Sequence, residues 1–307
     1  MKKLTYILTL LVLSLSAQAQ HEFRFTPHGS LLKINLNNVS IEGYDGKEII
    51  FQGEKIASDE SDERAKGLVA MSQSGYTDNT GLGISVSEKG NEIIVNIPKR
   101  QILSQISIKV PQNLKIQIET YTSNGVYIRN LSMSSQNDII LKNLRNEIEV
   151  SVNNENIKLE NTSGPMNIKT ISGKIEALFS NNVKGPISML SIQNLVDVTL
   201  PKALKLNVDL YSQYGKIYAP QDLNIVRDPV ENTDNNALMS STGAITIHSD
   251  SIKTTYGVRG GNQTSVFSNL YNFRSGSGEM IKGKVNGGGS IDIILKSFNK
   301  NIYLRQN

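Results

Sequence analysis

Cysteine and tryptophan are absent from this chain of 307 residues, and histidine occurs only three times, at His21, His28 and His248. Without cysteine the chain can form no disulfide, thiolate zinc site, iron–sulfur cluster or cysteine nucleophile. Two of the three histidines lie near the start of the sequence and the third lies far from them, which argues against a multi-histidine metal site. We therefore expect neither a resident metal nor a cofactor.

A strong excess of one charge is also missing, because 32 basic side chains oppose 28 acidic ones. Such a balanced surface gives no electrostatic footprint for nucleic acid, which we therefore do not expect as a partner. Long apolar runs are missing as well, since no stretch approaches the roughly 20 residues that a membrane-spanning helix needs. The sequence thus predicts no transmembrane segment.

The first 19 residues carry the three parts of a secretory signal peptide. Lys2 and Lys3 form the positive region, residues 7–15 are apolar, and Ala17-Gln18-Ala19 is a small-x-small cleavage site. A short buried helix is the alternative, but it would leave the cleavage pattern to chance. Removal of residues 1–19 predicts an extracytoplasmic location, in the periplasm, on the cell surface or in the medium.

Isoleucine and asparagine are abundant, with 35 and 32 copies. Because β-branched residues favour strands and asparagine favours tight turns, this composition is typical of many short strands joined by turns. Segments 32–36, 106–110 and 114–118 alternate apolar and polar residues with period two, as half-buried strands do. We therefore predict an all-β protein.

Apolar pairs recur every nine residues in the middle of the chain. Their first members are Ile139, Ile148, Ile157, Met166 and Ile175, and their second members are Leu141, Val150, Leu159, Ile168 and Ala177. The bends between the strands are expected at the same interval, at Asn137, Asn146, Glu155, Gly164 and Gly173. A unit of one strand and one turn cannot bury its apolar face alone, so successive units must stack.

This repeat predicts a single-stranded parallel β-helix, that is, a β-solenoid. We expect it to be right-handed, because crossovers between parallel strands are right-handed in nearly all known cases. It should run continuously over residues 20–307, with its most regular coils in 106–220 and long loops at 57–82, 222–242 and 256–290. A separate N-terminal β-domain over residues 20–105 is the alternative.

Two nine-residue units per coil would place residues 18 apart above one another on the same sheet. Ile157 then points inward as part of a continuous aliphatic core. The outward-facing Lys158 lies opposite Glu176 of the next coil, in a favourable cross-strand pair.

Three stretches of the sequence resemble a known family. They are Ile106-Ser107-Ile108-Lys109-Val110-Pro111 with the strand after it, Val196-Asp197-Val198-Thr199-Leu200-Pro201 with Gly215-Lys216-Ile217-Tyr218 behind it, and the Asn-Gly-Gly-Gly and Asn-Ile-Tyr patterns within 285–305. They resemble the putative adhesin domain family of secreted bacterial proteins, a domain of unknown function built as a parallel β-helix. The turns at 193–195 and 299–301 depart from the family's Asn-Gly turns. The resemblance spans roughly residues 106–305 and implies an extracytoplasmic, adhesin-like role.

Candidate catalytic residues are few. Carbohydrate-cleaving β-helices hold two or three carboxylates on neighbouring coils of one face, as acid and base or as metal ligands. Asp197, Asp209 and Asp292 are the candidates for such a site, although we favour their interpretation as solvated outward residues. No Asp recurs with the nine-residue interval, as a calcium-binding roll would need. The glycine-rich segments 81–83 and 287–289 lead into no helix, so we interpret them as turns.

Aromatic residues gather in a glycine-rich stretch near the C-terminus, with arginines among them. They are Tyr256, Phe267, Tyr271 and Phe273, with Arg259 and Arg274. Stacked aromatic rings can bind sugars or bases, although we favour the interpretation that these rings fill the core. If any patch binds a ligand, the sequence points to this one. Asp250-Ser251-Ile252 also matches a short acceptor motif for O-glycans in secreted bacterial proteins.

We therefore predict a non-enzymatic, secreted or periplasmic, adhesin-like β-helix protein that acts as a binding scaffold at the cell envelope. Its partner would be an envelope component or a glycan, and we assign no catalytic, cofactor-binding or metal-binding residue. The alternative is a polysaccharide-active β-helix enzyme, a lyase or a hydrolase, which would need outward carboxylates grouped on adjacent coils. An envelope-stress or sensory component is a third hypothesis.

Overall fold

The computed structural model describes residues 21–54, 64, 75–98, 104–120, 138–180, 182–228, 245–249, 252–256 and 278–307. In this part of the chain the protein is all-β with almost no helix. Two large, mostly parallel sheets form the fold, beside one separate two-stranded sheet. The predicted signal peptide, residues 1–19, lies outside the described residues.

The ten-stranded sheet, sheet A, has the spatial order β1 (His21–Phe25), β4 (Ile49–Gly53), β7 (Ile106–Pro111), β3 (Val39–Tyr44), β9 (Asp138–Lys142), β11 (Asn156–Thr162), β13 (Ile175–Phe179), β15 (Val196–Leu200), β23 (Ile302–Gln306) and β17 (Ile217–Tyr218). The eleven-stranded sheet, sheet B, has the order β18 (Ile225–Arg227), β21 (Glu279–Val285), β16 (Leu206–Ser212), β22 (Asp292–Ser297), β14 (Ile187–Ser191), β12 (Met166–Thr170), β10 (Ile148–Val152), β8 (Lys115–Glu119), β2 (Leu31–Ile34), β6 (Glu92–Asn96) and β5 (Ser85–Lys89). The small sheet pairs β19 (Ile245–Ser249) with β20 (Ile252–Tyr256).

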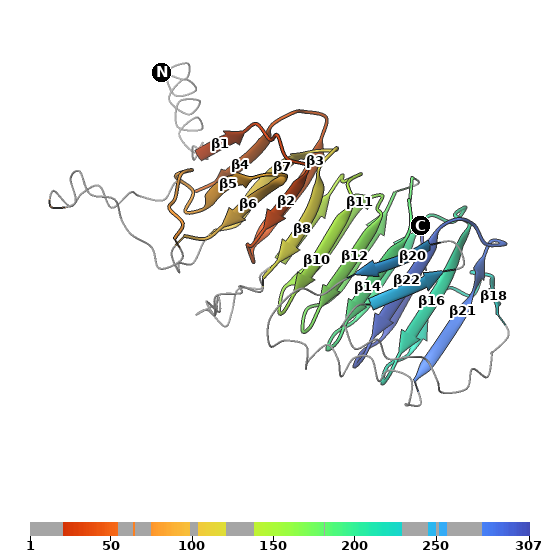
Figure 1. The fold of residues 1–307 in the computed structure, drawn as a ribbon. Coiled ribbons are helices and arrows are strands. Elements are labelled where there is room, and N and C mark those ends of the chain that lie inside the picture. Colours follow the sequence, from red (N-terminus) through yellow and green to blue (C-terminus); the bar gives the residue numbers. More distant parts are fainter. Residues whose placement is uncertain are drawn as a thin grey trace, which may run out of the picture.

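The chain passes back and forth between the two large sheets. Over residues 138–200, β9, β11, β13 and β15 lie in sheet A, and the strands between them, β10, β12 and β14, lie in sheet B. We call one strand of sheet B, together with the sheet A strand that follows it, a coil. Successive coils pair in parallel register, and the resulting stack is elongated (Figure 1).

Residues 18 apart are neighbours in the middle of this stack, as the repeat predicts. Ile157 pairs with Ile139 on one side and with Ile175 on the other. The predicted opposition of Lys158 and Glu176 is confirmed, because the two residues are direct partners in the register of β11 and β13.

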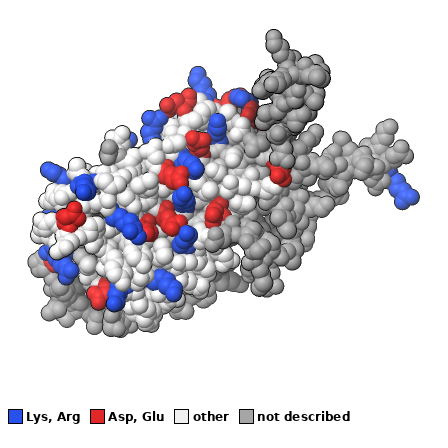
Figure 2. All heavy atoms as spheres, turned by 180° about the vertical axis from the view of Figure 1, so that it is seen from behind, with Lys and Arg blue, Asp and Glu red and all other residues white. Residues whose placement is uncertain are grey.

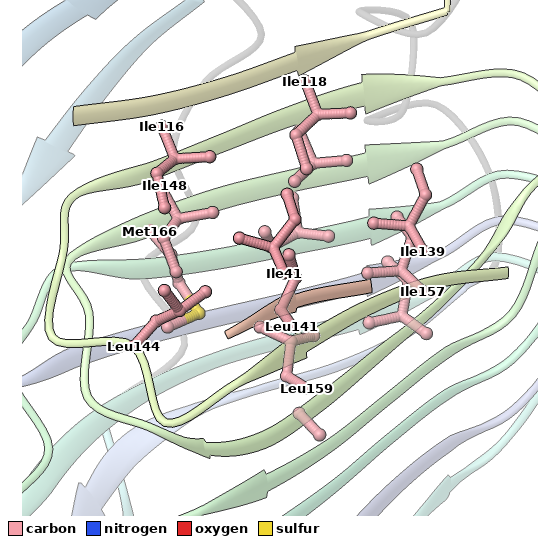
Figure 3. Close-up of a cluster of buried hydrophobic side chains, with 14 of the residues drawn as sticks. Ile41, Ile116, Ile118, Ile139, Leu141, Leu144, Ile148, Ile157, Leu159 and Met166 are labelled. Atoms are coloured by element: carbon pink, nitrogen blue, oxygen red, sulfur yellow. The ribbon is translucent and has the colours of Figure 1, made fainter. Parts of the chain in front are cut away.

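The core lies between the two sheets and is aliphatic along its length. Of the predicted inward residues, Ile139, Leu141, Val150, Ile168 and Ile175 expose 0% of their surface, and Ile148, Ile157, Leu159, Met166 and Ala177 expose 5% or less. Side chains from both sheets point toward one another between them (Figure 3). Each buried aliphatic side chain contributes about 1.5–3 kcal/mol, so the whole row, rather than any single contact, stabilises the stack.

Asparagine and glycine occupy bends between the strands, as their conformational preferences predict. Asn143 and Asn161 both have a positive φ of 53°. The Asn161 side-chain amide donates to Asn143 Oδ1 at 2.7 Å, so equivalent bends are joined from coil to coil. Gly173 is required at its bend, because a β-carbon there would lie 1.8 Å from the carbonyl oxygen of Glu155.

A column of buried hydroxyl groups follows the bends that lead from sheet B into sheet A. Its members are Thr170, Ser191, Ser297 and Ser212, which neighbour one another in that order. Each hydroxyl accepts a hydrogen bond from the backbone N–H three residues later and donates one to a bend carbonyl of the neighbouring coil. Because each hydroxyl bonds both within and between coils, this hydroxyl column favours one register of the stack.

In the coil β10–β11 a valine stands at the position of these hydroxyl groups, and Glu155 accepts the hydrogen bonds of the bend instead. There Val152 pairs with Thr170, and the side chain of Val152 can accept no hydrogen bond. The carboxylate of Glu155 instead accepts from the backbone N–H groups of Asn153, at 3.1 Å, and Asn154, at 3.0 Å. Burial raises the pKa of the Glu155 carboxyl above its ordinary value, even though these hydrogen bonds oppose the rise.

The coils at the two ends of the chain are inserted out of sequence order. Coil β2–β3 stacks between β6–β7 and β8–β9. Coil β22–β23 stacks between β14–β15 and β16–β17. A chain that winds without interruption would stack its coils in sequence order, so the arrangement differs from this expectation at both ends.

Antiparallel strands complete the two ends of the stack. Strands β1, β4 and β5 do so at the N-terminal end, and β21 and β18 at the other. The three segments predicted to be long loops contribute strands or a core residue to the fold. Segment 256–290 includes β21, segment 222–242 includes β18, and within 57–82 Leu82 is fully buried in the core.

Candidate functional site

The inserted coil β22–β23 brings two tyrosines together at the end of sheet A. β23 pairs with β17, so that Tyr303 lies directly beside Tyr218. Their rings are stacked, with centroids 5.2 Å apart and planes within 9° of each other. Among the described strands β17 is the last of sheet A, and the surface of Tyr218 is 46% exposed.

An ion pair flanks the other side of Tyr303. Asp197 is the register partner of Tyr303 on β15. The Arg305 guanidinium binds the Asp197 carboxylate through two hydrogen bonds, Nε to Oδ1 at 2.7 Å and Nη2 to Oδ2 at 2.9 Å. It also lies 5.4 Å from the centroid of the Tyr303 ring. Hydrogen bonding to Asp197 raises the pKa of Arg305.

Asn301 fixes the position of the Tyr303 ring. Its side-chain amide donates to the Tyr303 hydroxyl at 2.9 Å. Its Oδ1 accepts from the backbone N–H of Lys216, immediately before β17, at 2.9 Å. One side chain thus ties the phenol to the neighbouring coil.

A second aromatic pair lies at the bend of the same two coils. The Tyr214 N–H donates to the Phe298 carbonyl at 3.0 Å, and the two rings meet edge to face, with centroids 5.2 Å apart at 86°. Tyr214 is 71% exposed. We call Tyr214, Phe298, Tyr218 and Tyr303 the aromatic strip; each of the two coils contributes one ring to each pair.

The aromatic strip combines apolar ring faces with polar groups at one edge. Aromatic rings pack against flat or weakly polar ligand faces, as in the recognition of bases and sugars. The Arg305 guanidinium has five N–H donors, of which the pair with Asp197 uses two, and the carboxylate has further lone pairs. This arrangement suits a ligand with an apolar face and a rim of hydroxyl groups.

The rest of the outer face of sheet A carries charges of alternating sign. Lys109, Glu42, Lys142 and Glu160 are successive register partners across four strands. Lys142 Nζ lies 3.1 Å from Glu160 Oε2, and Lys158 Nζ lies 2.6 Å from Glu160 Oε1. Hydrogen bonds from these two lysines lower the pKa of Glu160. Figure 2 shows basic and acidic side chains interspersed on this side, so the face has no strong charge of one sign.

Comparisons with known proteins give little guidance to this site. No family model matches the chain, and no curated protein matches it at a significant level. One solved structure, described as that of a putative cell adhesion protein from Clostridium sporogenes, is 13% identical, with a TM-score of 0.39; the match covers 94% of this chain and 100% of that chain. So weak a similarity carries no argument, and the resemblance to an adhesin family stays a prediction.

The three carboxylates proposed for sugar cleavage are not brought together. Asp197 lies on the outer face of sheet A, whereas Asp209 and Asp292 belong to the neighbouring strands β16 and β22 of sheet B. Asp209 Oδ2 lies 3.7 Å from Lys282 Nζ. Asp292 Oδ1 accepts from Asn207 Nδ2 at 2.8 Å. Asp197 is therefore separated from the other two, while Asp209 and Asp292 lie at half-exposed positions of neighbouring strands on the same face of sheet B. The enzyme hypothesis stays a prediction.

The aromatic patch predicted near the C-terminus lies mostly outside the described residues. Tyr256 ends β20, while Arg259, Phe267, Tyr271, Phe273 and Arg274 are among the residues not described, as are Asp250 and Ser251 of the acceptor motif. The prediction for this patch is therefore untested.

The histidines take part in local contacts. His21 Nε2 lies 3.0 Å from the carbonyl oxygen of Thr80, and His28 Nδ1 lies 3.2 Å from Glu88 Oε2. His248 belongs to β19. Within the described ranges, no three His, Asp or Glu side chains are grouped as metal ligands. The same residues include no helix with the length and apolar character to cross a membrane.

The aromatic strip was not predicted from the sequence, although the sequence contains a signal for one of its two aromatic pairs. Ile217-Tyr218 and Ile302-Tyr303 are the same dipeptide, each at the start of a strand. Their similarity indicates equivalent positions in two coils. Their contact depends on insertion of the last coil beside β17, which the spacing of apolar residues does not predict.

Proposed function

We propose that the protein is an exported, non-enzymatic β-solenoid with an adhesin-like role at the cell envelope, and that the aromatic strip binds a glycan. The stacked pair of Tyr218 and Tyr303 carries this proposal. Tyr303 covers one face of the Tyr218 ring and supports it. The opposite face of this exposed ring is a flat apolar surface of the kind against which the apolar face of a sugar ring packs.

Rigidity of the strip supports this assignment. Tyr303 is held by strand pairing on both sides of β23, by stacking on Tyr218 and by the hydrogen bond from Asn301. A ring that is already ordered loses little conformational entropy when a ligand binds, and this lowers the cost of binding. An exposed aromatic pair without this support would bind sugars less well.

The distribution of charges around the aromatic strip and along sheet A favours an uncharged glycan as the ligand. Asp197 and Arg305 neutralise each other beside Tyr303, and among the described residues the charges farther along sheet A alternate in sign. An acidic polysaccharide would be favoured by a surplus of positive charge. The ion pair instead offers donors and acceptors to hydroxyl groups.

The scaffold role rests on the stacked architecture. Coils in parallel register build two long outer faces from outward-pointing residues, and the hydroxyl column and aliphatic core stabilise the stack between those faces. The predicted signal peptide would deliver such a scaffold outside the cytoplasm. A long, nearly neutral face of this kind suits adhesion to an envelope surface.

A pull-down tests the proposal. The chain without residues 1–19 is immobilised and exposed to a panel of neutral and acidic glycans and to solubilised envelope fractions. We expect retention of a neutral glycan by the wild type and its loss in Tyr218→Ala. Leu178→Ala is the matched control, because Leu178 lies on the same face and is also 46% exposed. Retention that Tyr218→Ala leaves unchanged would contradict the proposed site.

A further inference from the structure

A row of apolar and basic side chains crosses the outer face of sheet B, the sheet that does not carry Tyr218 and Tyr303. We propose that this row binds a linear acidic polysaccharide, whose sugar units carry carboxylate groups. We call the row the basic stripe, and its members are Met280, Tyr211, Lys296, Leu190 and Lys169. The proposal does not rest on glycan binding at the aromatic strip.

The basic stripe runs across five neighbouring strands of sheet B. Tyr211 on β16 pairs with Met280 on β21 and with Lys296 on β22. Leu190 on β14 pairs with Lys296 and with Lys169 on β12. Met280 is 58% exposed and the other four are partly exposed, so every member has surface that a ligand can contact. Neighbouring strands are about 4.8 Å apart, which places the two lysines about 10 Å from each other.

The two lysines of the basic stripe differ from other lysines on this face. Lys33, Lys115 and Lys282 each form an ion pair with a carboxylate. Within the described part of the chain, no ion pair involves Lys169 or Lys296. Two ammonium groups without an acidic partner in one row favour an anionic ligand whose charges recur along its length.

The surroundings of Lys169 strengthen its preference for an anion. Burial lowers the pKa of Lys169, because desolvation disfavours the charged ammonium, and the charge of Glu149 opposes this effect from beyond ion-pair distance. A carboxylate bound at Lys169 Nζ would compensate for this desolvation. Binding of an acidic group therefore satisfies a side chain that the protein leaves without a bonded counter-charge.

Asn167 adds an acceptor for a hydroxyl group beside Lys169. It precedes Lys169 by two residues on β12, so both side chains lie on the outer face. Asn167 is 5% exposed, and its Oδ1 has no hydrogen-bond partner. A buried acceptor without a donor is costly, and a hydroxyl group of a bound sugar would satisfy it. Ser188, the register partner of Asn167, places a further hydroxyl next to Leu190.

Acidic residues on one side of the basic stripe decide which kind of anion fits. Asp209 precedes Tyr211 by two residues on β16, and Glu149 is a register partner of Asn167. A membrane surface or a nucleic acid duplex would bring its negative charges against these carboxylates as well, and the two would repel each other. A single polysaccharide chain is narrow enough to follow the row of lysines. Tyr211 and Leu190 then contact the apolar faces of its sugar rings.

Calorimetry with oligogalacturonate as the probe tests this proposal on the chain without residues 1–19. The methyl-esterified form of the same oligosaccharide is the matched probe, because it keeps the sugar rings and lacks the charges. Lys169→Met and Lys296→Met each remove one ammonium group and keep an unbranched apolar stem. Lys142→Met is the control variant, because it removes the same charge from the outer face of sheet A. The thermal transition of each variant shows that it is folded.

We expect oligogalacturonate to bind the wild type and to bind Lys169→Met and Lys296→Met about fivefold or more weakly. Lys142→Met and Tyr218→Ala should bind it like the wild type, and the methyl ester should bind about fivefold or more weakly than the acid. Equal affinity for acid and ester, or unchanged affinity in folded Lys296→Met, would overturn the proposal. Loss of binding in Tyr218→Ala would assign the acid to the aromatic strip instead. Binding to phosphatidylglycerol vesicles without binding to oligogalacturonate would also contradict the proposal.

Discussion

The Ser297 hydroxyl donates a hydrogen bond to the carbonyl of Asn194 at 3.0 Å, across 103 residues of sequence. The same hydroxyl accepts from the backbone N–H of Lys300 at 3.2 Å. One buried side chain thus closes the bend of the last coil and joins that bend to a coil in the middle of the chain. The coil that carries Ser297, β22–β23, is inserted in the stack between β14–β15 and β16–β17, and this insertion builds the aromatic strip.

Substitution of this serine should lower stability without a change of fold. Ser297→Ala leaves the Asn194 carbonyl and the Lys300 N–H without this partner in a buried bend, at a cost of about 1–3 kcal/mol in the free energy of unfolding. Urea denaturation measures the loss. Ser188→Ala, on the half-exposed side of β14, is the control and should change stability by less than about 0.5 kcal/mol. Equal effects of both variants would show that the hydroxyl column contributes nothing.

A charge in the core should be much more damaging. Ile157 is 1% exposed and is surrounded by aliphatic side chains, so Ile157→Lys should destabilise the protein by about 4 kcal/mol or more and sharply lower its melting temperature. Lys158→Ala changes the next residue, which faces outward, and should shift the free energy of unfolding by less than about 0.5 kcal/mol. Differential scanning calorimetry distinguishes the two. An unchanged transition in Ile157→Lys would refute the inward assignment.

The buried carboxyl of Glu155 should make stability depend on pH. Because its folded-state pKa is raised, its contribution is fully present below the unfolded pKa, near 4.5, and is lost as the pH rises through the folded-state value. Glu155→Gln does not titrate and keeps an acceptor for the two bend N–H groups. The variant should therefore gain stability relative to the wild type as the pH rises from 4 to 8, measured by urea denaturation. A difference in the free energy of unfolding between Glu155→Gln and the wild type that stays the same from pH 4 to 8 would argue against a raised pKa of Glu155.

The interior of the stack could be predicted from the sequence, while the order of the coils could not. The nine-residue interval from Ile139 to Ile175 requires alternation between two faces, and it correctly gave the buried residues and the pairing of Lys158 with Glu176. The nine-residue interval alone does not show which coils are neighbours in the stack. Ser191 and Ser212 introduce bends of the same length as Ser297 does, so local patterns are compatible with several stacking orders.

The candidate site depends on the order of the coils, which could not be predicted from the sequence. Tyr218 and Tyr303 meet only because β23 pairs with β17, a contact between strands far apart in the sequence. The three carboxylates proposed from the sequence are divided between the two sheets. Asp197 faces out from sheet A, and the strands that carry Asp209 and Asp292 belong to sheet B. The separation of Asp197 from Asp209 follows from the alternation of successive strands between the two sheets.

The non-enzymatic proposal predicts that the protein releases no reducing sugar and no unsaturated product from any polysaccharide it retains. Asp197→Ala should leave this negative result unchanged, while it frees Arg305 beside Tyr303 and weakens glycan retention severalfold. Reducing-sugar assays and absorbance of unsaturated products measure turnover. Turnover by the wild type that Asp197→Ala abolishes would overturn the non-enzymatic proposal.

Titration of the retained glycan against the wild type, Tyr218→Ala, Tyr303→Ala and Leu178→Ala by calorimetry tests the central claim most directly. Loss of either stacked ring should weaken affinity about tenfold, which corresponds to about 1.4 kcal/mol, within the range measured for aromatic contacts. Leu178→Ala should bind like the wild type. Equal affinity in all four proteins would contradict the claim that the inserted coil builds a glycan site with β17.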